Sequence, residues 1–433
     1  MRTRYLAGAA TAALALSFVP ATAWAGGGDG PGLRVTTAAD SVDAQPGDGF
    51  CADSAGACSL RAAVQEANAS GGGTIDLKKG TYTLTIGGID EDAAATGDLD
   101  VTSRITLDGN GATVDAAGTD RVFDVLAGAS LTLTDATLTG GSAQGEGMPA
   151  SGGGVRNAGE LVVDRSTLTA NTAVRAGGAI EAVEGSTTTV SGSTLSDNST
   201  GPGPGNGGGL HLTGAGIVQV ERSTVTGNTA AAEGGGLWNS GTGTMTVTRT
   251  EITGNTASGD EATNGGGGLY NDGGELTVDG SEIRDNVADG ASGSGGGILN
   301  NEGTLVVESS TIGANSSSRA GGGVEANVGT TTLRRTTLTA NTTGDNPGNG
   351  GGLHLTGAGT VTIERSAVTG NSAANEGGGL WNSEPGTMTV TRTEINGNDA
   401  PTGPDTFQDG NGDGFTIDGE VVPPTSPENS SRS

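Results

Sequence analysis

Apolar and polar positions alternate along most of this chain, and the alternation is organised into nine repeats between residues 152 and 398. Each repeat opens with a glycine triplet and an aliphatic residue, continues as a short run rich in valine or threonine, and ends at an asparagine. Successive triplets start 25 to 32 residues apart, which is typical of solenoids, whose repeats pack on their neighbours. The asparagines are Asn171, Asn198, Asn228, Asn255, Asn286, Asn315, Asn341, Asn371 and Asn398.

Two apolar columns accompany the asparagines. Valine, leucine or isoleucine stands eight and three residues before every one of them, and the tenth residue before them is mostly apolar as well. Because the intervening residues are polar or variable, the period is that of a strand with one buried face. We therefore predict an all-β fold, a single-stranded right-handed parallel β-helix over residues 74–403, with the hand set by the usual crossover preference.

Stacking of the coils gives the asparagines a role. Coils of a β-helix lie about 4.8 Å apart, so equivalent residues of successive repeats stand above one another. An asparagine at the same corner of every coil can donate its amide hydrogen to the next, and we predict a buried structural ladder of all nine.

Part of the array is duplicated at an offset of 143 residues, as the triplets at Gly152 and Gly295 or at Gly207 and Gly350 show. The two histidines, His211 and His354, form such a pair. Five coils place them about 24 Å apart, so they cannot serve one site. We interpret each as a surface or packing residue.

Composition and charge narrow the classes of partner. Aromatic residues make up 3% of the chain and glycine 84 of 433 residues, which is too little bulk for one large core but enough for a thin apolar column. The formal net charge of −29 argues against a nucleic-acid partner, because phosphates require a basic surface. The negative charge favours solubility, calcium binding or a basic partner.

The N-terminus has the features of an export signal, with Arg2 and Arg4, an apolar stretch over residues 5–19 and a small-residue cleavage pattern at residues 23–25. We predict a signal peptide over residues 1–25 and a secreted protein that is monomeric and has no membrane span in its mature form. Release into the medium and retention at the cell surface are both open. A membrane anchor is the alternative, for which the apolar stretch is short.

An N-terminal segment over residues 26–73 differs from the repeats. Cys51 and Cys58 lie close together in an exported chain, which favours a disulfide over a metal site. Ser59 can N-cap a short helix whose apolar face is formed by Leu60, Ala63, Val64 and Ala67. Such a helix would cover the open end of the β-helix, whose edge otherwise invites aggregation.

Three strings carry a family resemblance: CSLRAAVQEANA at residues 58–69, TIDLKKGTYTLT at residues 74–85 and ITLDGNGATVDAAGTDRVFDV at residues 105–125. They resemble the N-terminal module of bacterial CSLREA-motif right-handed β-helix proteins, with Ala62 in place of the motif's glutamate. The repeats are similar to those of the polymorphic outer-membrane protein class, although we expect no autotransporter barrel after them. The resemblance implies a secreted or surface-exposed protein, often presumed adhesive, and supplies no catalytic residues.

Two functions remain open. The first is a non-catalytic surface or adhesion protein that binds an extracellular glycan or protein. The second is a polysaccharide lyase or glycoside hydrolase of the pectin-lyase-like fold that acts on an acidic polysaccharide, and it rests on analogy of fold. The sequence lacks Gly-His-Gly and Arg-x-Lys strings, which disfavours a polygalacturonase-like enzyme. A cluster of acids from several coils beside an arginine or lysine in a groove would favour the enzyme.

Large rings recur in the column that follows the triplets and mark a candidate ligand site. The aromatic residues of that column are Trp238, Tyr270 and Trp381. Trp238 and Tyr270 belong to neighbouring coils, and on an exposed strand edge they could receive a sugar ring. The alternative is that the rings only shield the glycine corner.

The last informative string is DGNGDGFTIDGE, within a segment over residues 404–433 that we expect to be a turn and flexible tail. Asp409, Asn411, Asp413, the Phe415 carbonyl and Glu420 match the spacing of an EF-hand loop, which predicts a weak calcium site. Four prolines around the string deny it the flanking helices of an EF-hand, so a plain turn is the alternative.

Overall fold

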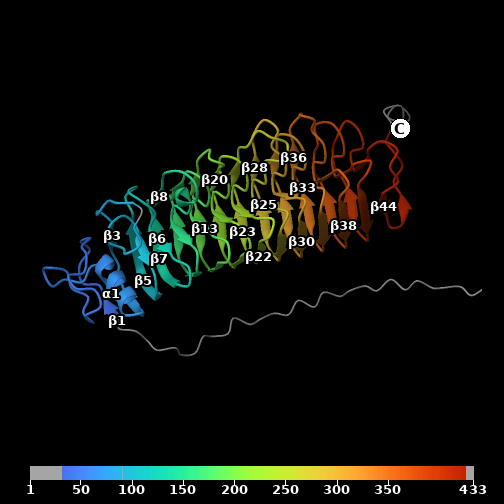
Figure 1. The fold of residues 1–433 in the computed structure, drawn as a ribbon. Helices are drawn as coiled ribbons and strands as arrows, with labels where there is room; N and C mark the ends of the chain where they lie inside the picture. The colour runs from blue at the N-terminus through green and yellow to red at the C-terminus, as the bar shows by residue number, and fades with distance from the viewer. Residues whose placement is uncertain (1–31, 90, 426–433) are drawn as a thin grey trace, which may run out of the picture.

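The computed structural model describes residues 32–89 and 91–425. These residues form an elongated right-handed β-solenoid whose coils stack in chain order along one axis (Figure 1). The predicted fold class is therefore confirmed. One short α-helix, α1 (Leu60–Ala69), lies at the N-terminal end, and a 3-10 turn, η1 (Met148–Ala150), interrupts a loop.

The solenoid has three sheets, of which A and B run its length and C extends from β8 to β36. Sheet A consists of β1 Gly32–Arg34, β2 Gly72–Asp76, β3 Thr81–Thr83, β5 Arg104–Asp115, β7 Ser130–Thr139, β10 Glu160–Asp164, β11 Thr167–Thr169, β14 Thr187–Ser191, β15 Thr194–Ser196, β18 Ile217–Glu221, β19 Thr224–Thr226, β22 Thr244–Thr248, β23 Glu251–Thr253, β26 Glu275–Asp279, β27 Glu282–Arg284, β30 Thr304–Glu308, β31 Thr311–Gly313, β34 Thr330–Arg334, β35 Thr337–Thr339, β38 Thr360–Glu364, β39 Ala367–Thr369, β41 Thr387–Thr391, β42 Glu394–Asn396, β44 Phe415–Ile417 and β45 Glu420–Val421.

Sheet B consists of β4 Leu99–Val101, β6 Phe123–Val125, β9 Val155–Asn157, β13 Ile180–Ala182, β17 Leu210–Leu212, β21 Leu237–Asn239, β25 Leu269–Asp272, β29 Ile298–Asn301, β33 Val324–Asn327, β37 Leu353–Thr356, β40 Leu380–Asn382 and β43 Thr406–Gln408. Sheet C consists of β8 Ser142–Ala143, β12 Thr172–Ala173, β16 Ser199–Thr200, β20 Thr229–Ala230, β24 Thr256–Ala257, β28 Val287–Ala288, β32 Ser316–Ser317 and β36 Thr342–Thr343. Strands pair in parallel with the equivalent strand of the next coil, and β44 with β45 is the antiparallel exception among the described strands.

The core follows the columns seen in the sequence. Val163 pairs in register with Val190, and both are fully buried, as are their counterparts in the later coils. The nine asparagines lie in one buried column beside this core. Asn255, for example, donates from Nδ2 to Asn286 Oδ1 at 2.9 Å and to the Val225 carbonyl at 2.9 Å. The column ends at Asn398, which donates to Asp405 Oδ1.

The glycine triplets allow the chain to turn back over sheet B. Gly207 has a φ of +63°, and a Cβ there would lie 2.5 Å from the Leu210 carbonyl and 2.7 Å from the His211 Cβ. Only glycine fits a corner with that backbone conformation and that close approach. In the coils that carry a triplet, the segment before the strand of sheet B therefore lies over the outward-facing residue of the same strand.

The N-terminal end is closed as expected. Ser59 caps α1 by accepting a hydrogen bond from the Ala62 amide at 3.0 Å, and Cys51 and Cys58 form a disulfide, which confirms that prediction. The buried face of α1 is wider than the sequence indicated, because Arg61 is also fully buried. The predicted signal peptide over residues 1–25 lies outside the described residues. No described helix has the length and apolar character needed to cross a bilayer.

The C-terminal end differs from the expected turn and tail. Residues 404–425 add one more coil, with β43 in sheet B and the β44–β45 hairpin in sheet A. Phe415 is fully buried in the core, which explains why this segment is held.

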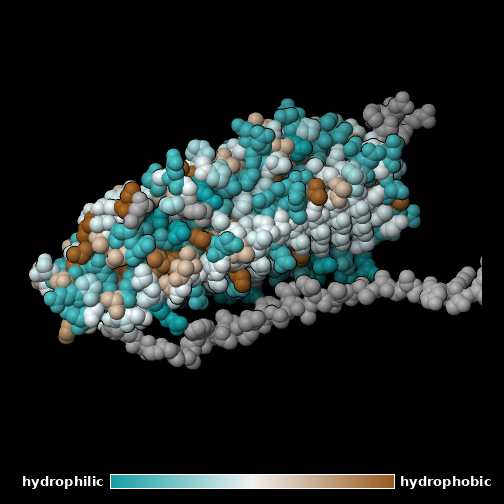
Figure 2. All heavy atoms as spheres, viewed as in Figure 1, coloured by the Kyte–Doolittle hydropathy of each residue, from teal (hydrophilic) through white to brown (hydrophobic). Residues whose placement is uncertain are grey.

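The surface in view is mostly polar or neutral, with hydrophobic residues as scattered spots (Figure 2).

Candidate functional site

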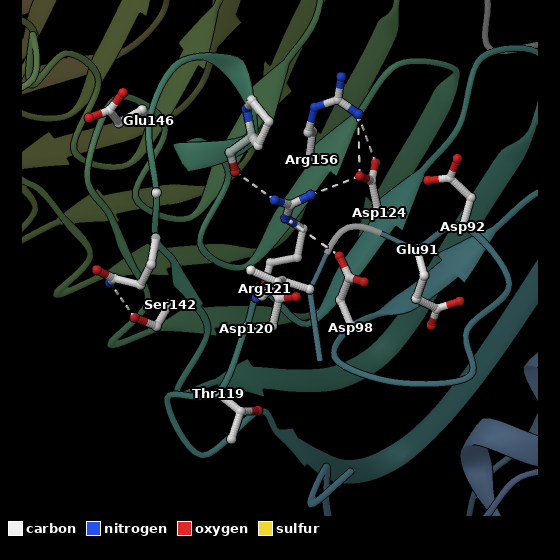
Figure 3. Close-up of a pocket in the computed structure, with 14 residues that line it drawn as sticks. Glu91, Asp92, Asp98, Thr119, Asp120, Arg121, Asp124, Ser142, Glu146 and Arg156 are labelled. Atoms are coloured by element: carbon white, nitrogen blue, oxygen red, sulfur yellow. Dashed lines mark hydrogen bonds and ion pairs between the residues drawn. The ribbon is translucent and has the colours of Figure 1, made fainter. Parts of the chain in front are cut away.

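The middle residue of each strand in sheet B faces away from the core, and these residues form a continuous outward column. At its N-terminal end the register pairs Asp100 of β4 with Asp124 of β6 and Arg156 of β9. Charged residues here replace the histidines and aromatic rings of the later coils. Asp98, Asp120 and Arg121, which immediately precede these strands, gather around the same point (Figure 3).

A cavity of about 380 Å³ opens at this point. Asp98, Asp120 and Asp124 line it together with Arg121 and Arg156. Its walls are completed by Ile89, Glu91, Asp92, Thr119, Ser142, Gln144, Gly145, Glu146 and Pro149. The three aspartates and Arg121 are each at most 8% exposed, so the polar groups meet at the base of the cavity.

Arg121 is the centre of the cluster. Its Nη1 donates to Asp124 Oδ2 at 2.8 Å and its Nη2 donates to the Pro149 carbonyl at 2.6 Å. Arg156 reaches Asp124 from the next coil, with Nη1 3.1 Å from Oδ1. Asp124 thus accepts charge-assisted hydrogen bonds from two guanidinium groups, which fix the position of its carboxyl group.

Two donors and one acceptor in this cluster lack good partners. The Nε atoms of Arg121 and Arg156 are buried and donate no hydrogen bond. Arg121 Nε lies 3.5 Å from Asp98 Oδ2, an ionic contact without hydrogen-bond geometry. The Asp98 carboxyl accepts no hydrogen bond from the described residues and is 6% exposed. Buried polar groups of this kind are rare in folded proteins and call for a partner.

Burial sets the protonation of three aspartates. It raises the pKa of Asp98 well above its usual value, with Arg121 opposing the shift. It raises the pKa of Asp100 to about 7, against a hydrogen bond from the Ala94 amide. It also raises the pKa of Asp120, which accepts from the Arg121 amide. Desolvation disfavours the charged form of each carboxyl, so acids of raised pKa lie beside the arginine-paired Asp124.

Asp98, Asp100 and Asp124 each bring an oxygen within 4.8 Å of the others, which makes them the candidate metal ligands of the described residues. The guanidinium of Arg121 already lies between Asp98 and Asp124 (Figure 3). Positive charge from arginine therefore stands where a cation would otherwise balance these carboxylates.

The N-terminal cap holds one wall of the cavity. Arg61 of α1 donates to the carbonyls of Ala94, Gly97 and Asp98 at 2.8 to 3.1 Å and pairs with Asp40 at 2.7 Å. The backbone that carries Asp98 is thereby fixed to the helix.

The aromatic residues chosen from the sequence lie farther along the same column. Trp238 and Trp381 are 8% exposed and Tyr270 is 2% exposed, so the expectation of rings on an exposed edge is wrong. The covering segments contact them directly: Trp238 Nε1 donates to Glu233, and Tyr270 donates its hydroxyl hydrogen to the Thr263 carbonyl. Trp238 and Tyr270 stack with centroids 6.0 Å apart.

The histidines are buried members of the column. His211 Nδ1 lies 2.9 Å from Glu181 Oε2 and its ring stacks on Trp238, while His354 repeats the arrangement with Glu325 and Trp381. The packing role expected for them agrees with this burial.

The proposed calcium loop does not have the EF-hand form. The Phe415 carbonyl accepts a hydrogen bond from the Val422 amide, and Glu420 lies in β45, paired with Ile417. Asp409 and Asn411 instead border a depression beside β43. Calcium binding by Asp409, Asn411, Asp413, Phe415 and Glu420 stays a prediction.

Comparison with known families agrees with the fold. A family model described as right handed beta helix region matches residues 103–257 and 208–399. The chain belongs to the right-handed β-helix family. Membership fits a pectin-lyase-like fold and specifies no activity. No curated protein and no solved structure matches this β-helix chain.

Sequence reasoning missed the charged cluster of this β-helix protein. It described the column that follows the glycine triplets but did not extend that column backwards to Asp124 and Asp100. The signal was present, because GDLDV at residues 97–101 and DRVFDV at residues 120–125 both end in an Asp-Val pair that the register places together.

Proposed function

We propose that this protein is a secreted β-helix that binds a neutral polysaccharide at the cavity built by Asp98, Asp120, Arg121, Asp124 and Arg156. The observation that carries the proposal is the group of buried polar atoms at its base: the Nε–H groups of Arg121 and Arg156, which donate no hydrogen bond, beside the Asp98 carboxyl, whose contact there is the ionic one with Arg121. A sugar hydroxyl can donate and accept at once, so a few hydroxyls satisfy all three.

The charge of the cavity favours a neutral sugar over a uronic acid. Six acidic side chains line the cavity against two arginines, and both arginines already pair with Asp124. A carboxylate ligand could accept from the arginines but would face the carboxyl groups of Asp98, Asp120 and Asp124 at close range. Neutral hydroxyls avoid that repulsion.

Titration calorimetry with cello-, xylo- and β-1,3-gluco-oligosaccharides tests the proposal. We expect one of the neutral series to bind and Arg156→Ala to weaken its binding at least tenfold. Arg165→Ala is the matched control, since it removes the same charge from an exposed turn and should leave the affinity unchanged. Absence of binding by every neutral series, or tighter binding of oligogalacturonate, would overturn the proposal.

A second candidate function, glycoside hydrolysis, is favoured by one specific observation. Burial raises the pKa of Asp98, whereas Asp124 accepts hydrogen bonds from two guanidinium groups, and the two carboxyls lie within 4.8 Å of each other. Retaining glycosidases pair a protonated and an ionised carboxyl at about 5 Å. Asp98 would donate a proton to the glycosidic oxygen.

Release of reducing ends from the oligosaccharide that binds distinguishes hydrolysis from binding alone. If the protein is an enzyme, Asp98→Asn should abolish product formation while binding is retained. If the wild type releases no reducing ends over a day at pH 5 and pH 7, the hydrolase is excluded for that substrate and the binding function remains.

A further inference from the structure

The internal duplication supplies two versions of one cluster that can be compared directly. In the first version Glu233 and Trp238 lie beside Tyr270 of the next coil. In the second version Glu376 and Trp381, each 143 residues later, lie beside Phe407. Both tryptophans stack on the following ring at 6.0 Å and donate from Nε1 to the glutamate.

In the first version the protein itself completes the cluster. Eleven positions separate Asn255 from Gly266, and the loop between them lies against the glutamate and the ring. Asn264 of this loop donates to Glu233 Oε1 at 2.7 Å, and the Thr263 carbonyl accepts from Tyr270. Asn206 adds a further hydrogen bond to Glu233 at 3.2 Å.

In the second version the loop is six residues shorter, because only five positions separate Asn398 from Gly403. Pro401 occupies the position equivalent to Asn264, and its side chain has no hydrogen-bond donor for Glu376. Phe407 replaces Tyr270, so the second version has no hydroxyl that requires a carbonyl from the longer loop. Among the described residues the Glu376 carboxylate accepts one side-chain hydrogen bond, from Trp381 at 3.2 Å.

A cavity of about 360 Å³ takes the place of the loop. It is lined by Glu376, Thr402, Phe407, Asp409, Gly410, Asn411, Pro424 and Thr425. We infer that this cavity is a second ligand site, which binds one neutral hexose unit of a saccharide. Sugar hydroxyls replace Asn264 as donors to Glu376 and also donate to Asp409, while the Asn411 amide donates to a ring or hydroxyl oxygen.

The ligand class follows from the lining. Glu376 and Asp409 are acceptors, Asn411 and the two threonines supply donors, and Phe407 and Pro424 provide an apolar wall for the C–H face of a sugar ring. No lysine or arginine occurs among the described lining residues, so an anionic ligand has no counter-charge there. Ten strand steps of sheet B separate this site from Asp124, about 48 Å along the same face.

Saturation-transfer NMR tests the second site, with the methyl glycosides of glucose, galactose and mannose and with N-acetylglucosamine as probes. All measurements use an Arg156→Ala background, in which binding at the N-terminal cavity is weakened, and the part of the signal that depends on Glu376 reports the second site. We expect one probe to give saturation transfer and Glu376→Gln to reduce it at least fivefold. Glu233→Gln removes the same charge from the loop-covered duplicate and should leave the signal unchanged.

A loop exchange provides an independent variant. Replacing residues 399–402 with residues 256–265, together with Phe407→Tyr, rebuilds the first version of the cluster at the second position. This variant should fold, with a Tm no lower than the parent, and should lose the sugar signal. The inference is overturned if no probe gives a signal, if Glu376→Gln and Glu233→Gln act alike, or if the folded exchange variant still binds. A loss of sugar binding caused by Arg156→Ala alone tests the proposed function of the N-terminal cavity and does not bear on the second site.

Discussion

At the scale of single residues, the asparagine ladder shows how a polar side chain can hold a buried corner. Each amide donates to the asparagine of the next coil and to a backbone carbonyl, and its oxygen accepts from both the backbone and the side chain of the preceding asparagine. Every buried donor and acceptor of the corner is thereby satisfied, which makes the column sensitive to any single replacement.

Asn255→Ala should lower the free energy of unfolding by about 1 to 3 kcal/mol, because it leaves amide and carbonyl groups of two neighbouring coils without partners. Urea unfolding followed by circular dichroism measures the change. Asn396→Ala, at an exposed position of β42, is the control and should alter stability by less than about 0.5 kcal/mol. Equal effects of the two substitutions would contradict the structural role of the ladder.

Asp100 gives the protein a pH dependence that can be measured. Its pKa is raised to about 7, above its value in the unfolded chain, so the folded state binds more protons between pH 4 and 7. Stability must then fall as pH rises through this window, by up to about 4 kcal/mol from a shift of this size. Asp98 and Asp120 act in the same direction.

Asp100→Asn should flatten this dependence, since an amide can still accept from the Ala94 amide and carries no charge to desolvate. Thermal unfolding at pH 4.5 and pH 8 provides the measurement. We expect the variant to gain stability over the wild type at pH 8 and little at pH 4.5. A variant that is less stable at pH 8 would show that the carboxylate itself is required.

At the scale of elements, the cap and the first coils form one unit. Arg61 ties α1 to Asp40 and to three carbonyls in the wall of the N-terminal cavity, and all of these groups are buried. A buried arginine with a full set of partners fixes geometry, whereas its removal leaves Asp40 without its counter-charge, held by the Thr85 and Ile86 amides alone, and takes a donor from three carbonyls.

Arg61→Met should therefore cost about 3 to 5 kcal/mol in urea unfolding, far more than the loss of an exposed positive charge. Lys79→Met, at an exposed position, is the control and should change stability by less than about 0.5 kcal/mol. If the Arg61→Met protein unfolds within about 1 kcal/mol of the wild type, the arginine does not hold the cap to the solenoid.

The strands were predictable because stacking imposes the same apolar columns on every coil, and nine copies make each column unmistakable. The course of the covering segments was not predictable from the sequence. Strand periodicity says which way Trp238 and Tyr270 point, but their burial depends on the loop that ends at Asn264, whose path follows from hydrogen bonds to Glu233 and Tyr270. Asp98 and Arg121 lie in early coils without a glycine triplet, so no repeat marked them.

At the scale of the whole molecule, the solenoid presents one outward column on sheet B whose chemistry changes along the axis. Most of it is covered by the protein's own loops, as at His211, Trp238 and Tyr270. Within residues 32–89 and 91–425 the covering gives way to a cavity at the charged cluster near α1 and to another at the short loop near β43. A saccharide that contacts both would gain affinity from the linkage of its units.

The crystal structure of the protein with the oligosaccharide that binds in calorimetry tests the central claim most directly. We predict a sugar in the N-terminal cavity, with hydroxyl oxygens within hydrogen-bond distance of the Nε atoms of Arg121 and Arg156 and one hydroxyl against Asp98. A bound sugar that lies elsewhere on the solenoid, with both Nε atoms still unpaired and no sugar in the cavity, would contradict the account.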